Sequence, residues 1–298
     1  MKSQIPSYDI NSFEEYKNQG ILVARFDNYL RAHGHLRNAH RHTFYHLVYF
    51  TEGTGNQQID FEHFGIEPNQ IYFMRPGQVH EWVFDDPPAG YIINFSSDYF
   101  SSFLLDADYI RNLWFFKGDP CQQVIRVIET FRQKLCYLFE EILAEGAIIP
   151  PASDDLVRTL LLQIFMGICR YHSSAADSDK QPYRHQLVDR FRDLIEVHFM
   201  KHRFPKEYAE LLYVSPGHLN SLCISQLGKS AGTMIRDRVL LEAKRLLINL
   251  ELNVSEVSDR LNFKDQSYFI KFFKNYENIT PDKFRNQSLL QWKKKTQQ

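Results

Sequence analysis

The C-terminal half of the chain contains the stretch FKDQSYFIKFFK at residues 263–274, shortly after a predicted short helix over residues 257–261. Asp265 can cap a new helix, and Phe269 and Phe273 recur at the four-residue spacing of one buried helix face. The polar residues between the aromatic ones are therefore expected to face outward. Two short helices joined by a tight turn make a helix-turn-helix, the arrangement whose second helix enters the major groove of DNA.

A second copy of this pattern lies about 50 residues earlier in the chain. Its two helices are predicted over residues 208–212 and 216–227, with Ser215 as the cap and Pro216 in the first helical position. Residues 230–249, between the copies, are predicted to form one rigid helix of about 30 Å, which would hold the two recognition helices roughly one DNA turn apart. Two tandem units favour DNA binding over the alternative, a plain helical bundle.

The residues expected to face DNA are mostly polar in both copies. Amide side chains can pair with adenine edges, and lysines can reach guanine or phosphate. The expected set is Ser215, Gly217, His218, Asn220 and Ser221 in the first copy, and Lys264, Gln266, Ser267, Ile270, Lys271 and Lys274 in the second. Because the first copy has no Lys or Arg among these residues, we expect it to contribute mainly positioning and shape readout.

Charge is distributed unevenly between the two halves of the chain. Residues 1–181 contain 15 Lys+Arg and 23 Asp+Glu, a net charge of −8, whereas residues 182–298 contain 20 and 13, a net charge of +7. The two values sum to the −1 of the whole chain. A basic half favours contact with nucleic acid; the alternative is a helical domain with lysine-rich faces and no such partner.

The N-terminal half shows two kinds of periodicity. Residues 21–100 contain aromatic and β-branched segments separated by Gly and Pro turns, which predict a small antiparallel barrel or sandwich. Apolar residues at helical spacing from Val124 to Ile142, and again from Leu156 to Ile168, predict two helices that form a hairpin. We expect this hairpin to dimerise, because both stripes are strongly apolar; the alternative is that the helices pack on the barrel.

Four histidines of the predicted barrel are grouped by their spacing. His40, His42 and His46 share parity along one predicted strand and so point to one face, and His80 ends a later strand. Imidazoles suit Zn, Fe, Ni or Cu, but we favour metal-free, hydrogen-bonded pocket residues and expect no cofactor. The expected effector-binding residues are His40, His42, His46, His80, Trp82 and Tyr91, a lining that suits a sugar or another small polar molecule.

The C-terminal motifs resemble those of the AraC/XylS family of bacterial regulators over about 100 residues. The matching motifs are AxxLxVSPxHLN at 209–220, GKS at 228–230, FKDQSYFxKFFK at 263–274 and TPxxFR at 280–285. The resemblance implies a seven-helix DNA-binding domain and, usually, transcription activation. Asn262 and Asn278 replace family glycines, so a left-handed Asn is expected at both positions. Cys223 replaces a core Phe, so looser packing is expected there.

The N-terminal spacing HxHxxxH at 40–46 with PGxxH at 76–80 resembles the cupin barrel, which this family often carries as a sensing domain. In metal-binding cupins two His, an acid and a further His bind one ion. The acid is missing here, and His46 stands near its place. The rival to a regulator is therefore a metal-dependent cupin enzyme with the helical half as an accessory module.

These features together predict an α+β chain with four parts and no enzymatic activity. The parts are a cupin-like sensing barrel over 1–120, a helical hairpin over 121–172, a linker over 173–182 and a double helix-turn-helix domain over 183–298. The expected partners are double-stranded DNA, a small-molecule effector, a second copy of the chain and, for an activator, RNA polymerase.

The compartment is predicted from what the sequence lacks. The N-terminus is too polar for a signal peptide, and the apolar runs are too short to cross a bilayer. The cysteines, none in a CxxC pair, are expected to be buried free thiols: Cys121, Cys136, Cys169 and Cys223. We therefore expect a cytoplasmic bacterial protein that associates with the nucleoid and has no contact with membranes.

Overall fold

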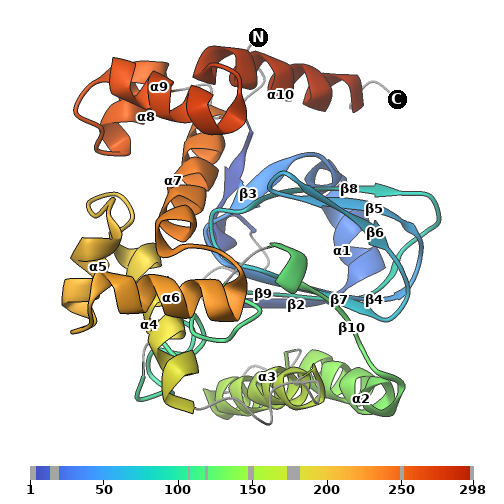
Figure 1. The fold of residues 1–298 in the computed structure, drawn as a ribbon. Helices are drawn as coiled ribbons and strands as arrows, with labels where there is room; N and C mark the ends of the chain where they lie inside the picture. The colour runs from blue at the N-terminus through green and yellow to red at the C-terminus, as the bar shows by residue number, and fades with distance from the viewer. Residues whose placement is uncertain are drawn as a thin grey trace. The chain divides into compact units, whose positions relative to one another are not determined.

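The computed structural model describes residues 5–13, 20–106, 108–117, 120–146, 151–172, 182–248 and 252–295. Beyond Ile5, these residues divide into two compact units, one within Pro6–Asp177 and one within Ser178–Gln298. Figure 1 shows both strands and helices in the first unit, whereas the elements labelled in the second unit are all helices. The predicted α+β class is confirmed. Most of the expected linker, residues 173–181, lies outside the described residues.

The first unit contains two five-stranded sheets that enclose a core. Their strand orders are β1-β3-β8-β5-β6 and β10-β7-β4-β9-β2. The strands are β1 Ser7–Tyr8, β2 Ile21–Arg25, β3 His40–His42, β4 Tyr45–Glu52, β5 Gly55–Ile59, β6 Glu62–Ile66, β7 Gln70–Met74, β8 Val79–Phe84, β9 Ala89–Phe95 and β10 Val124–Arg126. A short helix, α1 Phe26–Ala32, packs against β2 and β9. The predicted small β-domain is confirmed.

Alternating side chains along β4 and β9 divide the apolar residues between two cores. Val48 and Ile92 face the space between the sheets, whereas Tyr49 and Tyr91 face the opposite side of the second sheet. This alternation follows from the two-residue period of a strand. The second sheet is therefore apolar on both faces and needs a cover on its outer side.

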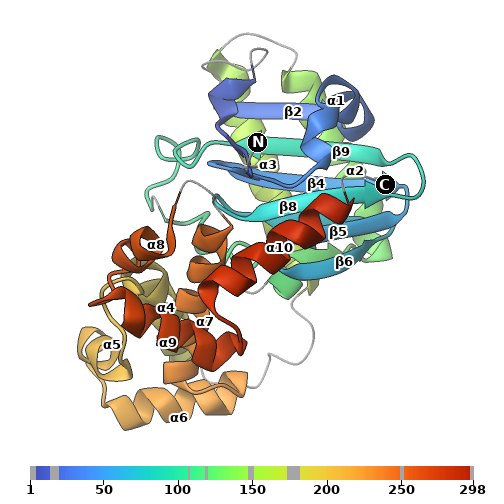
Figure 2. The same ribbon diagram turned by 90° about the horizontal axis from the view of Figure 1, so that it is seen from above.

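Helices α2 Glu129–Gly146 and α3 Pro151–His172 supply that cover. Figures 1 and 2 show both helices lying across the outer face of the second sheet. Phe139 stacks on Tyr91 at 4.7 Å, and Phe165 packs against Phe73 at 6.2 Å, between ring centroids. The alternative that the hairpin packs on the barrel is thus the one the structure supports, and its apolar stripes give no argument for dimerisation.

The start of the hairpin differs from the prediction. Val124 was expected to begin a helical stripe, but Val124–Arg126 forms β10 and pairs with β7. The helix begins only at Glu129. A short run of apolar residues fits either period, so the tertiary pairing decided the outcome. A boundary between barrel and hairpin at residue 120 therefore cuts through the second sheet.

The second unit forms seven helices over residues 182–248 and 252–295, as the family resemblance implies. They are α4 Pro182–His198, α5 Pro205–Leu211, α6 Pro216–Leu227, α7 Ala231–Leu247, α8 Val254–Arg260, α9 Gln266–Glu277 and α10 Pro281–Lys295. Figure 1 shows α7 connecting the α5–α6 pair to the α8–α9 pair. At 17 residues, α7 is about 25 Å long, shorter than the predicted 30 Å.

The structure bears on two expectations drawn from the sequence, the burial of the cysteines and the lack of membrane-spanning segments. All four cysteines are free thiols, but only Cys223 is buried, and Cys121 is exposed. The expectation that all four are buried is therefore wrong. Among the described residues, no helix is both long and apolar enough to span a membrane.

Candidate DNA interface and histidine cluster

The second helix of each helix-turn-helix unit begins with the same kind of side-chain cap. In the first, Ser215 Oγ accepts the His218 N–H at 3.2 Å and caps α6. In the second, Asp265 Oδ1 accepts the Tyr268 N–H at 2.8 Å and caps α9. Both caps confirm the predicted starts of α6 and α9. Each helix begins after the residue whose side chain accepts a backbone N–H that would otherwise have no partner in the first turn.

The turns of the two units contain the same backbone hydrogen bond. The N–H of Val214 donates to the Ala209 carbonyl and that of Phe263 to the Ser258 carbonyl, each at 3.0 Å. Ala209 and Ser258 are fully buried between the helices of their units. Both side chains are small, which leaves room for the two helices to approach. Sequence symmetry thus corresponds to structural symmetry.

Each unit also needs left-handed backbone at two positions. Asn262 has φ 57° and Asn278 has φ 59°, which confirms the expectation drawn from their replacement of glycine. The first unit uses Gly228 at φ 67° where the second has Asn278. It uses Tyr213 at φ 56° where the second has Asn262. Sequence reasoning missed Tyr213, whose bulky side chain is disfavoured in this region and is 93% exposed.

Helix α9 presents most of its predicted DNA-facing residues to solvent. Gln266, Ser267, Lys271 and Lys274 are exposed on α9, Lys264 is exposed in the turn before it, and Ile270 is half-buried. Positions 266, 267, 270, 271 and 274 fall on one face of a helix. Within the described parts of the chain, no ion pair is recorded for these three lysines. Their charge is available to an anionic partner.

Helix α6 differs from α9 in charge and in the use of its polar groups. Gly217, His218 and Ser221 are exposed as predicted, and α6 carries no Lys, Arg, Asp or Glu. Asn220, however, is half-buried, and its Oδ1 accepts the Ala231 N–H at 3.1 Å. The expectation of a freely outward Asn220 is therefore wrong, because its carbonyl oxygen anchors the start of α7 to α6.

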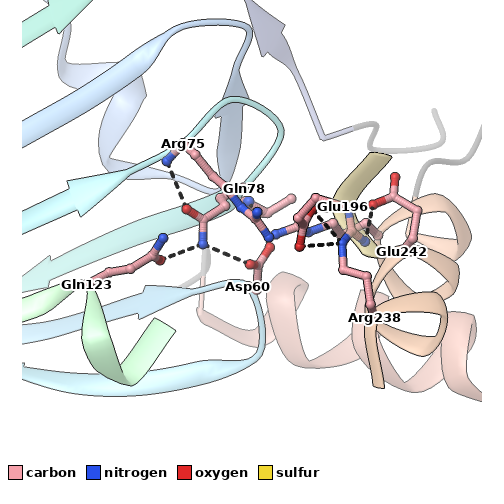
Figure 3. Close-up of polar contacts among 9 residues, drawn as sticks. Asp60, Arg75, Gln78, Gln123, Glu196, Arg238 and Glu242 are labelled. Carbon is pink, nitrogen blue, oxygen red and sulfur yellow. Dashed lines mark hydrogen bonds and ion pairs between the residues drawn. The ribbon is translucent and has the colours of Figure 1, made fainter. Parts of the chain in front are cut away.

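The basic residues of α7 are used inside the fold. Arg238 bonds Glu196 of α4 at 2.9 Å and Glu242 at 3.0 Å, as Figure 3 shows. Lys244 pairs with Glu277 of α9 at 2.8 Å. Part of the positive charge of the C-terminal half is therefore neutralised internally and orients α7 relative to α4 and α9.

A further contact joins the first helix-turn-helix unit to the second. Arg203, just before α5, donates to the Leu261 carbonyl and lies 4.5 Å from the centre of the Phe263 ring. Its backbone N–H donates to Glu207 Oε2 at 2.7 Å. Phe263 stands in the turn that precedes α9, so this arginine ties the start of one unit to the turn of the other. Sequence reasoning missed Arg203, because the carbonyl that its side chain binds lies 58 residues away in the sequence.

The predicted histidine cluster forms inside the barrel. His40, His42, His46 and His80 are 1%, 4%, 1% and 1% exposed, and neighbouring imidazole centroids lie 4.2–5.1 Å apart. The prediction that His40, His42 and His46 share one strand is wrong, because His40 and His42 belong to β3 and His46 to β4, and these strands lie in different sheets. His80 pairs directly with His40 across β8 and β3. The side chains converge because both sheets point them into the same interior.

Burial sets the protonation state of this cluster. Desolvation lowers the pKa of His40 to about 4 and that of His46 to about 3. It also lowers the pKa of His42 and His80 well below the ordinary value, with neighbouring histidines adding to the effect. All four imidazoles are therefore neutral near pH 7.

The other two predicted effector-binding residues, Trp82 and Tyr91, lie on opposite sides of the second sheet. Trp82 lies beside the cluster, 4.9 Å from the His80 ring. Tyr91 does not: it points out of the barrel, stacks on Phe139, and donates its hydroxyl hydrogen to Glu140 at 2.5 Å. Its place in the predicted pocket is wrong, because the parity of β9 puts Tyr91 on the α2 side. Asn94 has the opposite parity on β9, so its side chain faces the interior, where its Oδ1 lies 2.7 Å from His46 Nδ1.

A buried polar network fixes the strand that carries His80. Gln78 donates through Nε2 to Asp60 Oδ2 at 3.1 Å and to Gln123 Oε1 at 2.7 Å, as Figure 3 shows. Its Oε1 accepts the Arg75 N–H at 2.9 Å. Gln78 thereby ties the start of β8 to the β5–β6 turn and to the segment before β10. Sequence reasoning noted the motif around Gln78 but gave this residue no role.

The chain matches two family models that together span both units. Residues 28–165 match the AraC-like ligand binding domain, and residues 208–287 match a helix-turn-helix domain. The Arabinose operon regulatory protein of Salmonella typhimurium is 24% identical over 237 residues, covering 75% of this chain and 77% of that protein. The HTH-type transcriptional activator RhaR of Enterobacter sp. strain 638 is 21% identical over 284 residues, covering 92% and 94%.

Among solved structures, ToxT from Vibrio cholerae O395 aligns with 90% of this chain and 98% of its own, at 13% identity and a TM-score of 0.43. A ligand-binding β-domain followed by two helix-turn-helix units defines a DNA-binding transcription regulator. The chain belongs to the AraC/XylS family, in agreement with the family models and with its relatives.

Proposed function

We propose that this regulator places α6 and α9 in successive major grooves on one face of its DNA site and responds to an effector in its β-domain. Gln266 reads a base edge, and Lys264, Lys271 and Lys274 contact phosphate or guanine. Gly217, His218 and Ser221 of α6 contribute mainly positioning and shape readout. Asn220 acts as a positioning residue through its bond to α7.

The exposed face of α9 is the observation that carries this proposal. Together with Lys264 in the turn before α9, it combines an amide with three lysines that have no ion pair within the described residues, whereas Arg238, Lys244 and Arg245 of α7 pair with acids inside the fold. The backbone symmetry of the two units supports equal docking geometry for α6 and α9. The lack of charge on α6 supports an unequal division of base readout between them.

Selection of bound sequences from random DNA tests the readout. We expect the wild-type chain to enrich one sequence pattern, and Gln266→Ala to relax the preference at one or two base pairs, by about 1–3 kcal/mol per position. Gln287→Ala is the matched control, since Gln287 is exposed on α10. Unchanged selectivity of Gln266→Ala would remove this residue from the readout.

The remaining partners belong to the same proposal. We propose a homodimer formed through the outer surface of the hairpin, where Tyr137, Leu156 and Met166 remain exposed. We also propose activation through contact with RNA polymerase and action at the bacterial nucleoid. Light scattering of wild-type chain and of Tyr137→Ser tests the dimer: equal mass for both, at the monomer value, would contradict it.

The effector is proposed to be small and polar, with a sugar as the first class to test. This choice rests on the Salmonella relative, which is named for the arabinose operon. Calorimetry with a panel of sugars is the test, and absence of heat from all of them would argue against this class. The family comprises transcription regulators, so we propose no catalytic role for the β-domain.

A further inference from the structure

The histidine cluster contains buried ring nitrogens that have no hydrogen-bond partner. They include His42 Nδ1, His46 Nε2 and His80 Nε2. A buried polar atom without a partner is costly, and a group of them at one place requires an explanation. The residues involved are held in place by β3, β4 and β8, so they cannot turn outward to reach water.

The hydrogen bonds of the cluster indicate where its lone pairs lie. His40 Nδ1 is 2.7 Å from the Asn38 carbonyl oxygen, which can only accept, so Nδ1 carries the proton and Nε2 the lone pair. His40 Nε2 is in turn 3.0 Å from His42 Nε2. A proton or a cation must lie between two imidazole nitrogens at this separation.

The register of the sheet explains why three of the rings meet. His40 and His80 are direct partners across β3 and β8, and His42 follows two positions along β3 on the same face. One ring nitrogen from each of the three lies within 4.8 Å of the others. The centroids of these three rings lie only 4.2–4.9 Å apart, so a ligand that all three share must be as small as a single ion.

We propose that His40, His42 and His80 bind one divalent transition-metal ion inside the β-domain. Three neutral imidazoles suit Zn²⁺, Ni²⁺, Cu²⁺ or Fe²⁺, and the lack of a carboxylate in the group disfavours Mg²⁺ and Ca²⁺. The Asn38 carbonyl orients His40 as an outer partner of a metal ligand does.

His46 is the candidate for a fourth ligand. Its Nδ1 is 2.7 Å from Asn94 Oδ1, which leaves the buried Nε2 as the lone-pair nitrogen. Asn94 has no exposure to solvent and stands on β9, in the sheet opposite β3 and β8. A bound ion would thus crosslink strands of both sheets, and its occupancy would change the rigidity of the unit that we propose as the sensor.

Cobalt titration of the untagged full-length chain tests this inference, after treatment with a chelator. We expect one Co²⁺ per chain, visible-range absorption bands typical of nitrogen ligands, and a rise in melting temperature when Co²⁺ or Zn²⁺ is added. His42→Gln and His80→Gln are each expected to bind at least about 100-fold more weakly. His63→Gln, on the exposed side of β6, is the matched control and is expected to bind like wild type.

No uptake by the wild-type chain at one equivalent of metal would overturn the inference, and so would wild-type affinity in the two ligand variants. The wild-type titration decides the matter even where a variant does not fold. The inference builds on the proposed sensing role, but its test is separable from it. Sequence-specific DNA binding by a chain that takes up no metal overturns only the metal site, and metal uptake without DNA binding overturns only the proposed function.

Discussion

Lys274 lies on the exposed face of α9, one turn beyond Lys271, with no ion pair recorded in the described chain. Because a phosphate contact is independent of sequence, Lys274→Ala should weaken binding to all sequences alike. Its log affinity against log salt should be less steep by about 0.9. Fluorescence anisotropy over a salt series measures both effects. Lys283→Ala, exposed on α10, is the control and should leave the slope unchanged; an unchanged slope in Lys274→Ala would exclude the contact.

Asn278 ends α9 at φ 59°, a conformation that glycine adopts without strain and alanine does not. Asn278→Gly should therefore be neutral or slightly stabilising, and Asn278→Ala should lower the free energy of unfolding by about 1–2 kcal/mol. Urea denaturation of the full chain, followed through the helical signal, compares the two variants. Equal midpoints for Gly and Ala would contradict the assigned backbone strain.

At the scale of elements, helices α2 and α3 approach each other closely at Gly167. A Cβ atom added there would overlap the Phe131 ring of α2, which is fully buried. Gly→Ala within a helix ordinarily stabilises by about 1 kcal/mol, but here the sign should reverse, because overpacking costs about 1–3 kcal/mol. Thermal unfolding of Gly167→Ala measures this, and Ser225→Ala on α6 provides a helix-interior comparison. A raised melting temperature would contradict the packing of the hairpin.

The elements also show what sequence could and could not predict. The caps at Ser215 and Asp265 are local signals, so both recognition helices were predicted within a residue of their starts. Val124–Arg126 was predicted as helix, because its partner strand β7 lies about 50 residues away in the sequence. Non-local pairing overrides a short local pattern.

The same limit applies to side chains in the candidate sites. The four histidines were grouped correctly although the strand assignment was wrong, since inward-facing positions of two sheets meet in one interior. Tyr91 was misplaced because parity along β9 is meaningful only once the register with β4 is known. Asn220 was misjudged because its partner, the Ala231 N–H, appears only when α7 packs against α6.

At the scale of the whole molecule, the buried histidines make stability depend on pH. In the unfolded chain their pKa is about 6.5, whereas burial lowers it to about 4 for His40 and about 3 for His46. Between these values the unfolded chain binds more protons, so stability is complete above about pH 6.5 and is lost as the pH falls. Each imidazole contributes up to about 1.4 kcal/mol per pH unit in this window.

Thermal unfolding in the presence of a chelator checks this, at about pH 7.5 and about pH 5.5. We expect a lower melting temperature of the β-domain at the lower pH. The pH dependence should be shallower in His46→Gln, which removes one of the four groups, and unchanged in His63→Gln. A melting temperature that is the same at both pH values would mean that the cluster is not closed to protons in the folded chain.

The central claim is that two similar recognition helices, oriented by α7 and by the Arg203 contact, dock side by side on DNA. Hydroxyl-radical footprinting of the full chain on its selected site tests this claim most directly. We predict two protected segments on one face of the duplex, with centres about 10 base pairs apart. A single protected segment, or protection that does not repeat with the helical turn, would contradict it.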